Sequence, residues 1–406
     1  MKKVLFTLFA CFFACSAGAT HYKPITAGAV KRLAHDDKNL YILHFDGLEV
    51  RNKATGETLC YTQATGHIPE GNIYSTGNFH DAMLNAIAVH GDTVWVGGNG
   101  FLTAIVGQEA ESWHIPYDIT ISNPSYSSSP KLPMSFNCIE FDSKGTMYLG
   151  GIDQVGYLQK TGKASFVGLP SNGAQGTEVW QVLPAADGGV WVSYTSDSGN
   201  NSLARYTAGD EEVEEVSNKL GFRNQIKAMA VDGNGCLWFG VSRRDVNIYR
   251  YDGVSLETFD TGVSAQRGPC CMTFDDSGRL WLLYSNSGKI GYAQYSVGPL
   301  YCFMDGDPRE YPFPKGVGMA YCLDVDGDDV YVGTDNGVLK LADGRLSLLD
   351  TTWYSERPEE TAVKDCKTAS TGGDADAVYD LQGRRRSSNN SMKGIYIRNV
   401  RKILRP

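Results

Sequence analysis

Residues 228–240 read AMAVDGNGCLWFG and predict a β-hairpin. The small and apolar residues before Asp232 predict a buried strand, and the Gly and Asn residues after it tolerate the positive φ of a tight turn. Residues 237–240 (LWFG) predict the second strand. Farther along, residues 248–251 (IYRY) and 256–259 (LETF) predict two more strands on either side of a turn at Asp252. The segment therefore predicts a four-stranded antiparallel meander.

The same pattern occurs seven times along the chain. Each copy has a turn rich in Asp, Gly or Asn, then an apolar residue, an aromatic residue and another apolar residue. The aromatic positions are Tyr41, Trp95, Tyr148, Trp191, Trp238, Trp281 and Tyr331. Their spacing is close to the ~40 to 50 residues of a propeller blade. Because one meander cannot bury its faces alone, while meanders packed around an axis can, the repeat predicts an all-β fold, a seven-bladed β-propeller over residues 20–352.

The Asp-x-x-Gly-x-x-Trp core of this repeat stands at residues 232–238 and again at 275–281. It resembles the two-component-regulator propeller repeats of Bacteroidetes sensor proteins and, more distantly, the propeller of the streptogramin-lyase type. The resemblance covers roughly residues 30–350. It implies the fold far more specifically than a function, because one fold hosts many functions. Those sensors continue into a membrane helix and kinase modules, so a sensor role here implies a separate signalling chain.

The N-terminus predicts export. Lys2 and Lys3 precede an apolar run over residues 4–14, and small residues follow at 17–19, which is the pattern of a signal peptide over residues 1–19. The run is shorter than the ~20 residues of a membrane-spanning helix, and no later stretch approaches that length, so we expect no transmembrane segment. A lipoprotein attached through Cys15 is the alternative.

The C-terminal residues 377–406 carry a second resemblance. The segments VYDLQGR at 378–384 and KGIYI at 393–397 resemble the C-terminal sorting signal of the type IX secretion system, although Arg385 stands where an apolar residue is usual. The resemblance implies the type IX secretion machinery as a partner. It also implies a protein secreted from, or held on the outer-membrane surface of, a Gram-negative bacterium. Residues 353–376 are rich in Glu, Thr, Ser and Gly and predict a linker. A basic hairpin without a sorting role is the alternative.

Charge argues against a nucleic-acid partner. The net charge is −9, although the tail after residue 377 is strongly basic, so the propeller itself is acidic. An acidic body repels nucleic acid over long range, and a polyanionic ligand would need a local basic pocket.

Neither a cofactor nor a metal ion is expected. Residues 324–329 (DVDGDD) look like a calcium loop but lack Gly at the sixth position, and they align with ordinary first hairpins of the other repeats. The eight cysteines after the signal peptide permit a disulfide framework. However, Cys138, Cys271 and Cys322 align with Ala86 and Ala228 of other repeats, which predicts small buried residues instead.

Catalysis is the less favoured reading, and whether the protein is an enzyme stays open. All seven histidines lie before residue 115, so a lyase that uses a late-blade His as general base has none available. A site in the first half of the chain, built from His44, His67 or His80, remains an alternative. A sialidase would need an arginine cluster, and only Arg243 and Arg244 lie in a suitable loop.

A ligand site is expected on one face of the propeller. The loops between second and third strands share that face with the connections between blades, and long ordered loops are often functional. Candidate ligand-binding residues there are His44, Tyr126, Asp153, Tyr194, Arg243, Arg244, Asn286 and Asp335. Aromatic and hydrogen-bonding side chains together suit a glycan, a peptide or a protein partner. A binding module is the first hypothesis, a propeller polysaccharide lyase or glycosidase the second, and a sensor-like component the third.

Overall fold

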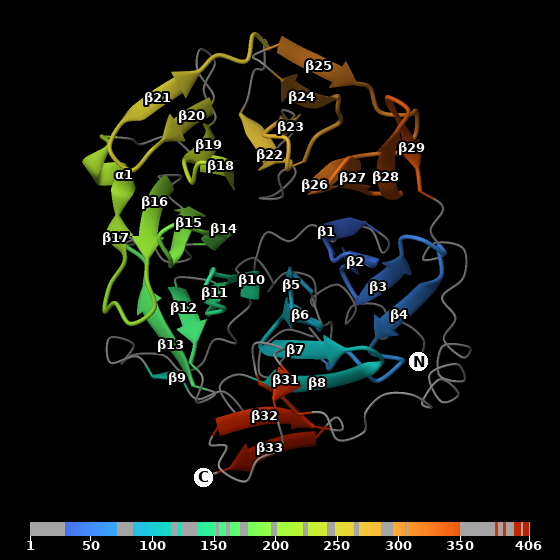
Figure 1. Cartoon of the computed structure of the whole chain (residues 1–406), viewed down its shortest axis with the longest axis vertical. Helices are drawn as coiled ribbons and strands as arrows, with labels where there is room; N and C mark the ends of the chain where they lie inside the picture. Colours follow the sequence, from blue (N-terminus) through green and yellow to red (C-terminus); the bar gives the residue numbers. More distant parts are fainter. Residues whose placement is uncertain are drawn as a thin grey trace, which may run out of the picture.

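Seven antiparallel sheets surround a central axis in the computed structural model (Figure 1). The model describes residues 29–70, 84–114, 121–122, 136–151, 154–159, 163–170, 178–195, 201–221, 226–241, 248–263, 268–285, 295–304, 307–349, 378–380, 385–386, 394–398 and 401–405. Each sheet contains a meander of four consecutive strands in sequence order, with the first strand of the meander innermost (Figure 1). The expected seven-bladed all-β propeller is therefore confirmed.

The first four blades follow the chain in order. Blade 1 contains β1 (Val30–His35), β2 (Asn39–His44), β3 (Gly47–Asn52) and β4 (Thr58–Thr62). Blade 2 contains β5 (Ala86–His90), β6 (Thr93–Gly98), β7 (Phe101–Val106) and β8 (Glu109–His114). Blade 3 contains β10 (Phe136–Phe141), β11 (Met147–Gly151), β12 (Gln154–Leu158) and β13 (Ala164–Gly168), with β9 (Ile121–Ser122) added at its outer edge. Blade 4 contains β14 (Glu178–Pro184), β15 (Val190–Thr195), β16 (Asn201–Tyr206) and β17 (Glu214–Glu215).

The last three blades complete the ring. A short helix, α1 (Val216–Lys219), precedes blade 5, which contains β18 (Ile226–Val231), β19 (Leu237–Val241), β20 (Ile248–Tyr251) and β21 (Leu256–Phe259). Blade 6 contains β22 (Pro269–Phe274), β23 (Leu280–Tyr284), β24 (Leu300–Met304) and β25 (Asp307–Tyr311). Blade 7 contains β26 (Ala320–Asp326), β27 (Asp329–Thr334), β28 (Gly337–Ala342) and β29 (Arg345–Leu348). Near the C-terminus, β30 (Val378–Asp380), β31 (Arg385–Arg386), β32 (Gly394–Arg398) and β33 (Arg401–Arg405) pair with one another.

No helix among the described residues is long and apolar enough to cross a membrane.

The repeated aspartates hold the first turn of several blades. In blade 5, Asp232 Oδ1 accepts hydrogen bonds from the backbone N–H groups of Asn234 and Cys236, and Asp232 Oδ2 accepts one from Trp238 Nε1 at 2.8 Å. In blade 6, Asp275 forms the same kind of bonds, including one from Trp281 Nε1 at 2.8 Å. One carboxylate thus fixes both the turn and the aromatic ring that follows it. These aspartates serve the fold, as in other side-chain-stabilised turns.

The seven repeated aromatic residues occupy equivalent positions. Each lies on the second strand of its blade, opposite an inner-strand residue: Trp95 faces Ala88, Trp238 faces Ala230 and Tyr331 faces Asp324. Five of the seven are buried, among them Trp281 at 2% exposure, while Trp191 and Trp238 are partly exposed. Blade 4 has Ala185 in place of the turn aspartate. There the Arg205 guanidinium lies over Trp191, 5.3 Å from its ring centroid, and donates to the Val190 carbonyl at 3.1 Å.

Glycines two residues after the aromatic let neighbouring blades approach closely. A Cβ added to Gly150 would lie 2.6 Å from Val179 Cγ1 of the next blade, and one added to Gly333 would lie 2.6 Å from Val30 Cγ1 of blade 1. Gly97 and Gly240 have the same relation to the first inner-strand residue of the following blade. Packing between blades therefore depends on the missing side chain at this position.

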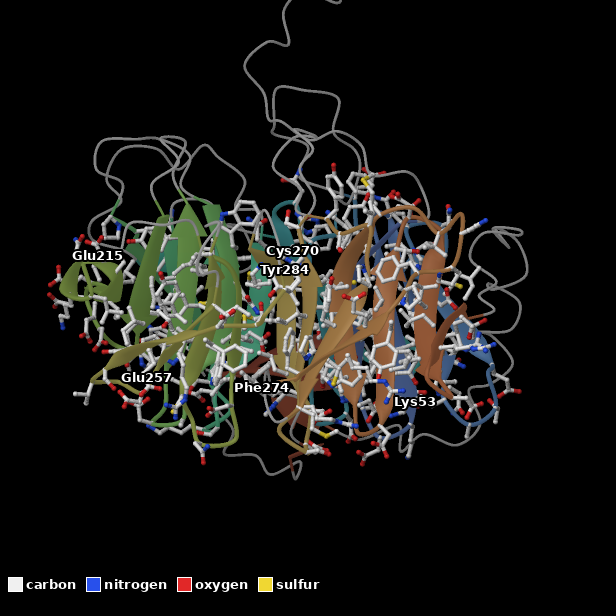
Figure 2. The ribbon with its side chains drawn as sticks, turned by 90° about the horizontal axis from the view of Figure 1, so that it is seen from above. Lys53, Glu215, Glu257, Cys270, Phe274 and Tyr284 are labelled. Atoms are coloured by element: carbon white, nitrogen blue, oxygen red, sulfur yellow. The ribbon has the colours of Figure 1, made fainter. Side chains whose placement is uncertain are left out.

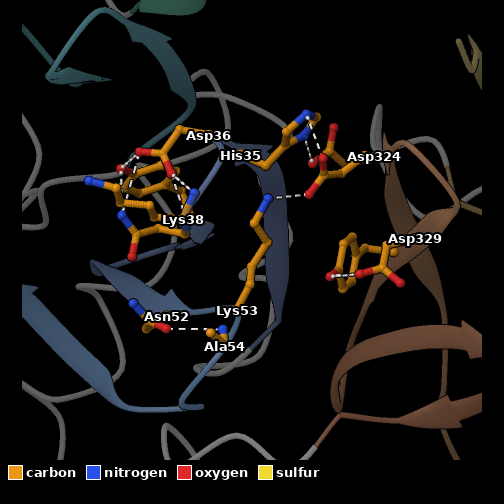
Figure 3. A network of polar contacts seen from close by, with 12 residues as sticks. His35, Asp36, Lys38, Asn52, Lys53, Ala54, Asp324 and Asp329 are labelled. Atoms are coloured by element: carbon orange, nitrogen blue, oxygen red, sulfur yellow. Dashed lines mark hydrogen bonds and ion pairs between the residues drawn. The ribbon is translucent and has the colours of Figure 1, made fainter.

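The ring closes between blade 7 and blade 1 by side-chain contacts. His35 Nδ1 lies 2.8 Å from Asp324 Oδ2, and Lys53 Nζ is paired with Asp326 (Figure 3). Closer to the axis, the Cys322 thiol points to the Val30 carbonyl at 3.8 Å. All four strands of blade 1 and all four of blade 7 come from continuous segments. Among the described strands, closure therefore involves none that is exchanged between the two ends of the propeller.

The seven described cysteines are free thiols. Cys138 and Cys322 are buried, as predicted from the repeat alignment, whereas Cys271 is partly exposed. Residues 324–329 form the hairpin between β26 and β27, with Asp326 paired to Asp329, which agrees with the prediction of an ordinary first hairpin.

Candidate ligand-binding face and central axis

The two faces of the ring differ in which strand ends they carry. We call upper the face where inner strands begin and second strands end. Cys270 at the start of β22 and Tyr284 at the end of β23 lie toward it, whereas Phe274 at the end of β22 lies toward the opposite, lower face (Figure 2). The aspartate-stabilised turns join first and second strands, so they lie on the lower face. Loops between second and third strands lie on the upper face, as predicted.

Inner strands are irregular at their upper ends. In six blades the pairing between first and second strands contains a β-bulge near the start of the inner strand. The bulged residues are Lys31, Asn137, Trp180, Lys227, Cys270 and Tyr321. In blade 2, Asn85 donates its backbone N–H to the Gly97 carbonyl at 2.9 Å while Gly97 also faces Ala86, so Asn85 has the equivalent place. Bulges redirect side chains and are frequent beside functional sites.

Several bulged residues link neighbouring elements at the upper face. Lys31 Nζ donates to the Leu84 carbonyl at 3.0 Å and to Asn85 Oδ1, and it lies 5.2 Å from the centroid of the Phe45 ring. Burial, reinforced by the nearby charge of Arg32, lowers the pKa of Lys31 to about 7. Two blades therefore share a lysine that is only partly charged at neutral pH.

The residue after the bulge reaches the inner strand of the next blade. The thiols of Cys138 and Cys271 each lie 3.3 Å from a backbone carbonyl there, those of Trp180 and Tyr321. Gln181 makes a two-way contact with Met229: its Oε1 accepts from the Met229 N–H at 2.8 Å, and its Nε2 donates to the Met229 carbonyl at 3.0 Å. These side chains satisfy backbone groups along the innermost strand edges.

In blade 1 the residue that follows the bulge is Arg32. Its side chain is much longer than those of the alanines and cysteines at the equivalent position in other blades. Arg32 influences the pKa of Cys138 and Glu140 in β10 and of Cys322 in β26. Glu140 lies two residues after Cys138, on the same side of its strand. The sequence analysis did not single out Arg32 or Glu140. A signal was present, since charged residues stand at these two places where most other repeats have Ala, Cys or Thr.

Three of the predicted ligand-binding residues are among the described ones. His44 is 1% exposed, and its Nε2 lies 3.7 Å from Oε2 of the fully buried Glu49. Tyr194 is 2% exposed and packs in a hydrophobic cluster with Val179 and Val192. Asp335 Oδ1 accepts from the Tyr321 hydroxyl at 2.6 Å, and its Oδ2 accepts from the Met319 N–H at 2.8 Å.

These three residues belong to three different blades, blades 1, 4 and 7. Asp335 is tied to the bulged residue of its own blade, whereas the His44 and Tyr194 side chains lie in the interior. The other predicted residues, Tyr126, Asp153, Arg243, Arg244 and Asn286, lie outside the described residues.

The fold is shared with solved propeller structures. A catalytically inactive virginiamycin B lyase from Staphylococcus aureus with quinupristin is 14% identical, with a TM-score of 0.57, over 77% of this chain and 94% of that chain. YCF48 bound to D1 peptide is 16% identical, with a TM-score of 0.52, over 80% of this chain and 94% of that chain. PorZ, a surface component of the type IX secretion system of Porphyromonas gingivalis, is 14% identical, with a TM-score of 0.52, over 76% of this chain and 46% of that chain.

No protein-family model matches the sequence, and no curated protein matches it. At these identities the structural likeness shows the architecture alone. The chain is a seven-bladed β-propeller with distant structural similarity to a propeller lyase and to a bacterial surface propeller.

Proposed function

We propose that this protein is an exported or surface-attached binding module that recognises a glycan, a peptide or a protein partner with the upper face of its propeller. The supporting observation is the difference between the two faces. On the lower face, carboxylates such as Asp232 and Asp275 are used to hold turns and indole rings. On the upper face, the inner strands carry bulged residues that vary from blade to blade, among them Lys31, Trp180 and Tyr321.

A binding surface on a repeat scaffold requires side chains that differ from repeat to repeat at an equivalent position, and the bulged residues meet this requirement. Six blades supply the same backbone irregularity, and the side chain placed there differs in size, charge and hydrogen-bonding capacity. Rigid scaffolds with variable surface residues are the usual arrangement for recognition. YCF48, which has this architecture, was solved with a bound peptide, and this supports a peptide among the possible ligands.

Binding is favoured over catalysis by the burial of the His44–Glu49 pair. A lyase or glycosidase needs a base or an acid within hydrogen-bond reach of its substrate. His44 and Glu49 have suitable chemistry and lie 3.7 Å apart, but they are 1% and 0% exposed. A substrate at the upper face cannot touch either group unless blade 1 opens.

Export is part of the proposal and rests on the sequence. Residues 1–19 act as the signal peptide, residues 353–376 as the linker and residues 377–406 as the sorting signal read by the type IX secretion machinery. The first two segments lie outside the described residues.

A glycan and peptide array probed with the mature chain would test ligand binding. We expect Trp180→Ala and Arg244→Ala each to weaken binding of an array ligand by ~2 kcal/mol, which is roughly 30-fold in affinity. Asp328→Ala is the matched control, because Asp328 is exposed in a lower-face hairpin. Equal affinity of all three variants would exclude the upper face. Turnover of a polysaccharide by the wild-type protein would establish the enzyme instead.

A further inference from the structure

The upper end of blade 6 carries two adjacent cysteines, Cys270 and Cys271. No other two cysteines are adjacent in the sequence. Cys270 is the bulged residue of β22, and Cys271 follows it as the residue that pairs with Leu283. Both residues have free thiols and are partly exposed, and Cys270 lies toward the upper face (Figure 2). Blade 6 therefore has a thiol both at the bulge and directly after it.

The bulge places the two cysteine side chains on the same side of their strand. Neighbouring side chains of a regular strand point to opposite faces. Cys271 and Met272 follow this rule, because Met272 packs in the cluster between blades 5 and 6 and Cys271 packs against the cluster between blades 6 and 7. Cys270 breaks the rule, since it packs against the same cluster as Cys271. A β-bulge redirects side chains in this way.

Blade 3 shows the same relation with one thiol. Its bulged residue, Asn137, donates to the Val179 carbonyl at 3.4 Å, and the Cys138 thiol lies 3.3 Å from the Trp180 carbonyl. Both carbonyls belong to β14 of the following blade. In both blades, the bulged residue and its successor therefore face the same neighbouring blade.

The two thiols of blade 6 are held near each other by weak contacts. Cys271 Sγ lies 3.3 Å from the Tyr321 carbonyl of blade 7. Cys270 Sγ lies 3.3 Å from the carbonyl of Leu283, the residue that pairs with Cys271. A hydrogen bond with the Cys271 side chain, together with burial, raises the pKa of Cys270. Because S–H is only a weak donor, the contacts with the two carbonyls do not prevent the thiols from turning toward each other.

We propose that Cys270 and Cys271 form a reversible disulfide by exchange with a low-molecular-weight disulfide. The thiolate of one cysteine attacks a sulfur of the external disulfide, forms a mixed disulfide and releases one thiolate. The thiolate of the other cysteine then attacks the protein sulfur of the mixed disulfide, and the second half of the external disulfide leaves. The two protein thiols lose two protons and two electrons, which the external disulfide takes up to become two thiols. The site goes beyond ligand binding by the upper face and does not depend on it.

Strain makes this disulfide easy to reduce. Adjacent Cα atoms across a trans peptide are ~3.8 Å apart, whereas the Cα atoms of bridged cysteines are usually ~4.4 to 6.8 Å apart. Strained disulfides have more oxidising potentials than structural ones. Closure also removes both S–H donors, so the Tyr321 carbonyl loses its hydrogen bond from blade 6. The oxidation state of the pair therefore changes a contact between blades 6 and 7.

The test is equilibration of the mature protein in glutathione buffers with an increasing oxidised fraction, followed by alkylation, digestion with trypsin and mass spectrometry. Trypsin releases residues 268–279, which contain both cysteines of the pair and no other. We expect at least about half of this peptide to lose two hydrogen atoms and escape alkylation in the most oxidising buffers. Dithiothreitol should restore both thiols. A peptide that carries glutathione on one cysteine without closure, or that stays alkylated on both, would overturn the proposal.

Two controls test the part played by the bulge. The double variant Cys270→Ser, Met272→Cys keeps two adjacent cysteines but places them on opposite faces of the strand. It should need an oxidised-to-reduced ratio at least about tenfold higher for the same extent of closure. The wild-type chain unfolded in urea has no bulge and should show a similar shift, which gives a readout if the double variant does not fold. Closure at the same ratio in the folded wild-type protein and in either control would contradict the role of the bulge.

Discussion

His35 Nδ1 and Asp324 Oδ2 lie 2.8 Å apart although the two residues are 289 positions apart in the chain. They belong to β1 and β26, the inner strands on either side of the junction between the first and last blades. Asp326 Oδ1 lies 3.7 Å from His35 Nε2, so the imidazole ring is placed between two carboxylates. This contact lies at the junction where the ring closes, and one of its members, His35, is titratable.

Stability of this junction should depend on pH. The hydrogen bond that His35 donates to the Asp324 carboxylate raises the pKa of His35 above its usual 6.5. The contribution of the His35–Asp324 contact to the free energy of unfolding is fully present at pH values below the pKa of His35 in the unfolded chain. It is lost as pH rises through the pKa of His35 in the folded protein. We expect Asp324→Asn to lower the free energy of unfolding by about 1 kcal/mol at pH 6 and by less at pH 9. Denaturant unfolding at both pH values measures this difference. Asp328→Asn, in the same hairpin, is the control, and an equal loss for Asp324→Asn at both pH values would contradict the pairing.

Close approach of blades at Gly240 gives a second prediction. A Cβ at this position would lie 2.5 Å from Cδ of Pro269, and closer still to Cγ, and a proline ring cannot rotate away. Gly240→Ala should therefore destabilise the propeller by about 2 kcal/mol or more. Gly233→Ala is the matched control in the same hairpin, because a Cβ there meets nothing within 4 Å. Comparable unfolding midpoints for the two variants would show that blades 5 and 6 are less closely packed.

The two indoles that bond turn aspartates should differ in their contribution to stability. Trp281 is 2% exposed, whereas Trp238 is partly exposed, and both donate to an aspartate at 2.8 Å. Trp281→Ala opens a buried void and should cost ~4 kcal/mol, while Trp238→Ala should cost less. Chemical denaturation of both variants gives the order. A larger loss for Trp238→Ala would mean that ring burial does not determine the contribution of these residues.

Thiol reactivity should report on the unfolding of the ring. Cys138 is buried, and burial raises the pKa of its thiol to about 12, so little thiolate forms at neutral pH. In proteins that retain a single cysteine, Cys138 and Cys322 should react with a disulfide reagent only at the rate of unfolding. Cys271, which is partly exposed, should react faster than either. Rapid labelling of Cys138 in the folded protein would contradict its burial.

Export can be tested by removing the tail. Deletion of residues 377–406 should leave a folded propeller inside the outer membrane, because the sorting signal would be missing. Cell fractionation followed by protease treatment of intact cells locates the protein. A variant with Arg384 to Arg386 changed to glutamine tests whether the basic residues themselves are read. Unchanged delivery of the deletion variant to the surface would remove the sorting proposal.

The blade repeat could be predicted from the sequence because its parts are local. A turn with Asp232 and Gly235 specifies its own hairpin, and Trp238 then marks the second strand without reference to the rest of the chain. Seven such units have only a few ways to bury their faces. The buried places of Cys138 and Cys322 followed from the same alignment.

The upper face and the axis were much harder to predict. A β-bulge at Lys31 depends on how two strands pair, and the residue sequence does not reveal that register. Tyr194 was predicted from its place at a strand end, but the side chain turns into the cluster around Val192. Arg32 and Glu140 stand out in the repeat alignment as charged residues, but how the ring brings blades 1 and 3 around one axis is a property of closure that the alignment does not reveal.

Continuity of each blade has a consequence for how such a protein can change over generations. The four-stranded meander of every blade uses consecutive strands, and the ring closes by side-chain contacts such as His35–Asp324, so one continuous segment of the gene encodes a complete meander. Duplicating or deleting one whole blade at the junction would divide no existing sheet. Such an event would only require new side-chain contacts between the two inner strands that meet at the junction. A lineage could thus explore rings of different size by copying whole segments, while the residues at the upper end of the axis diversify separately.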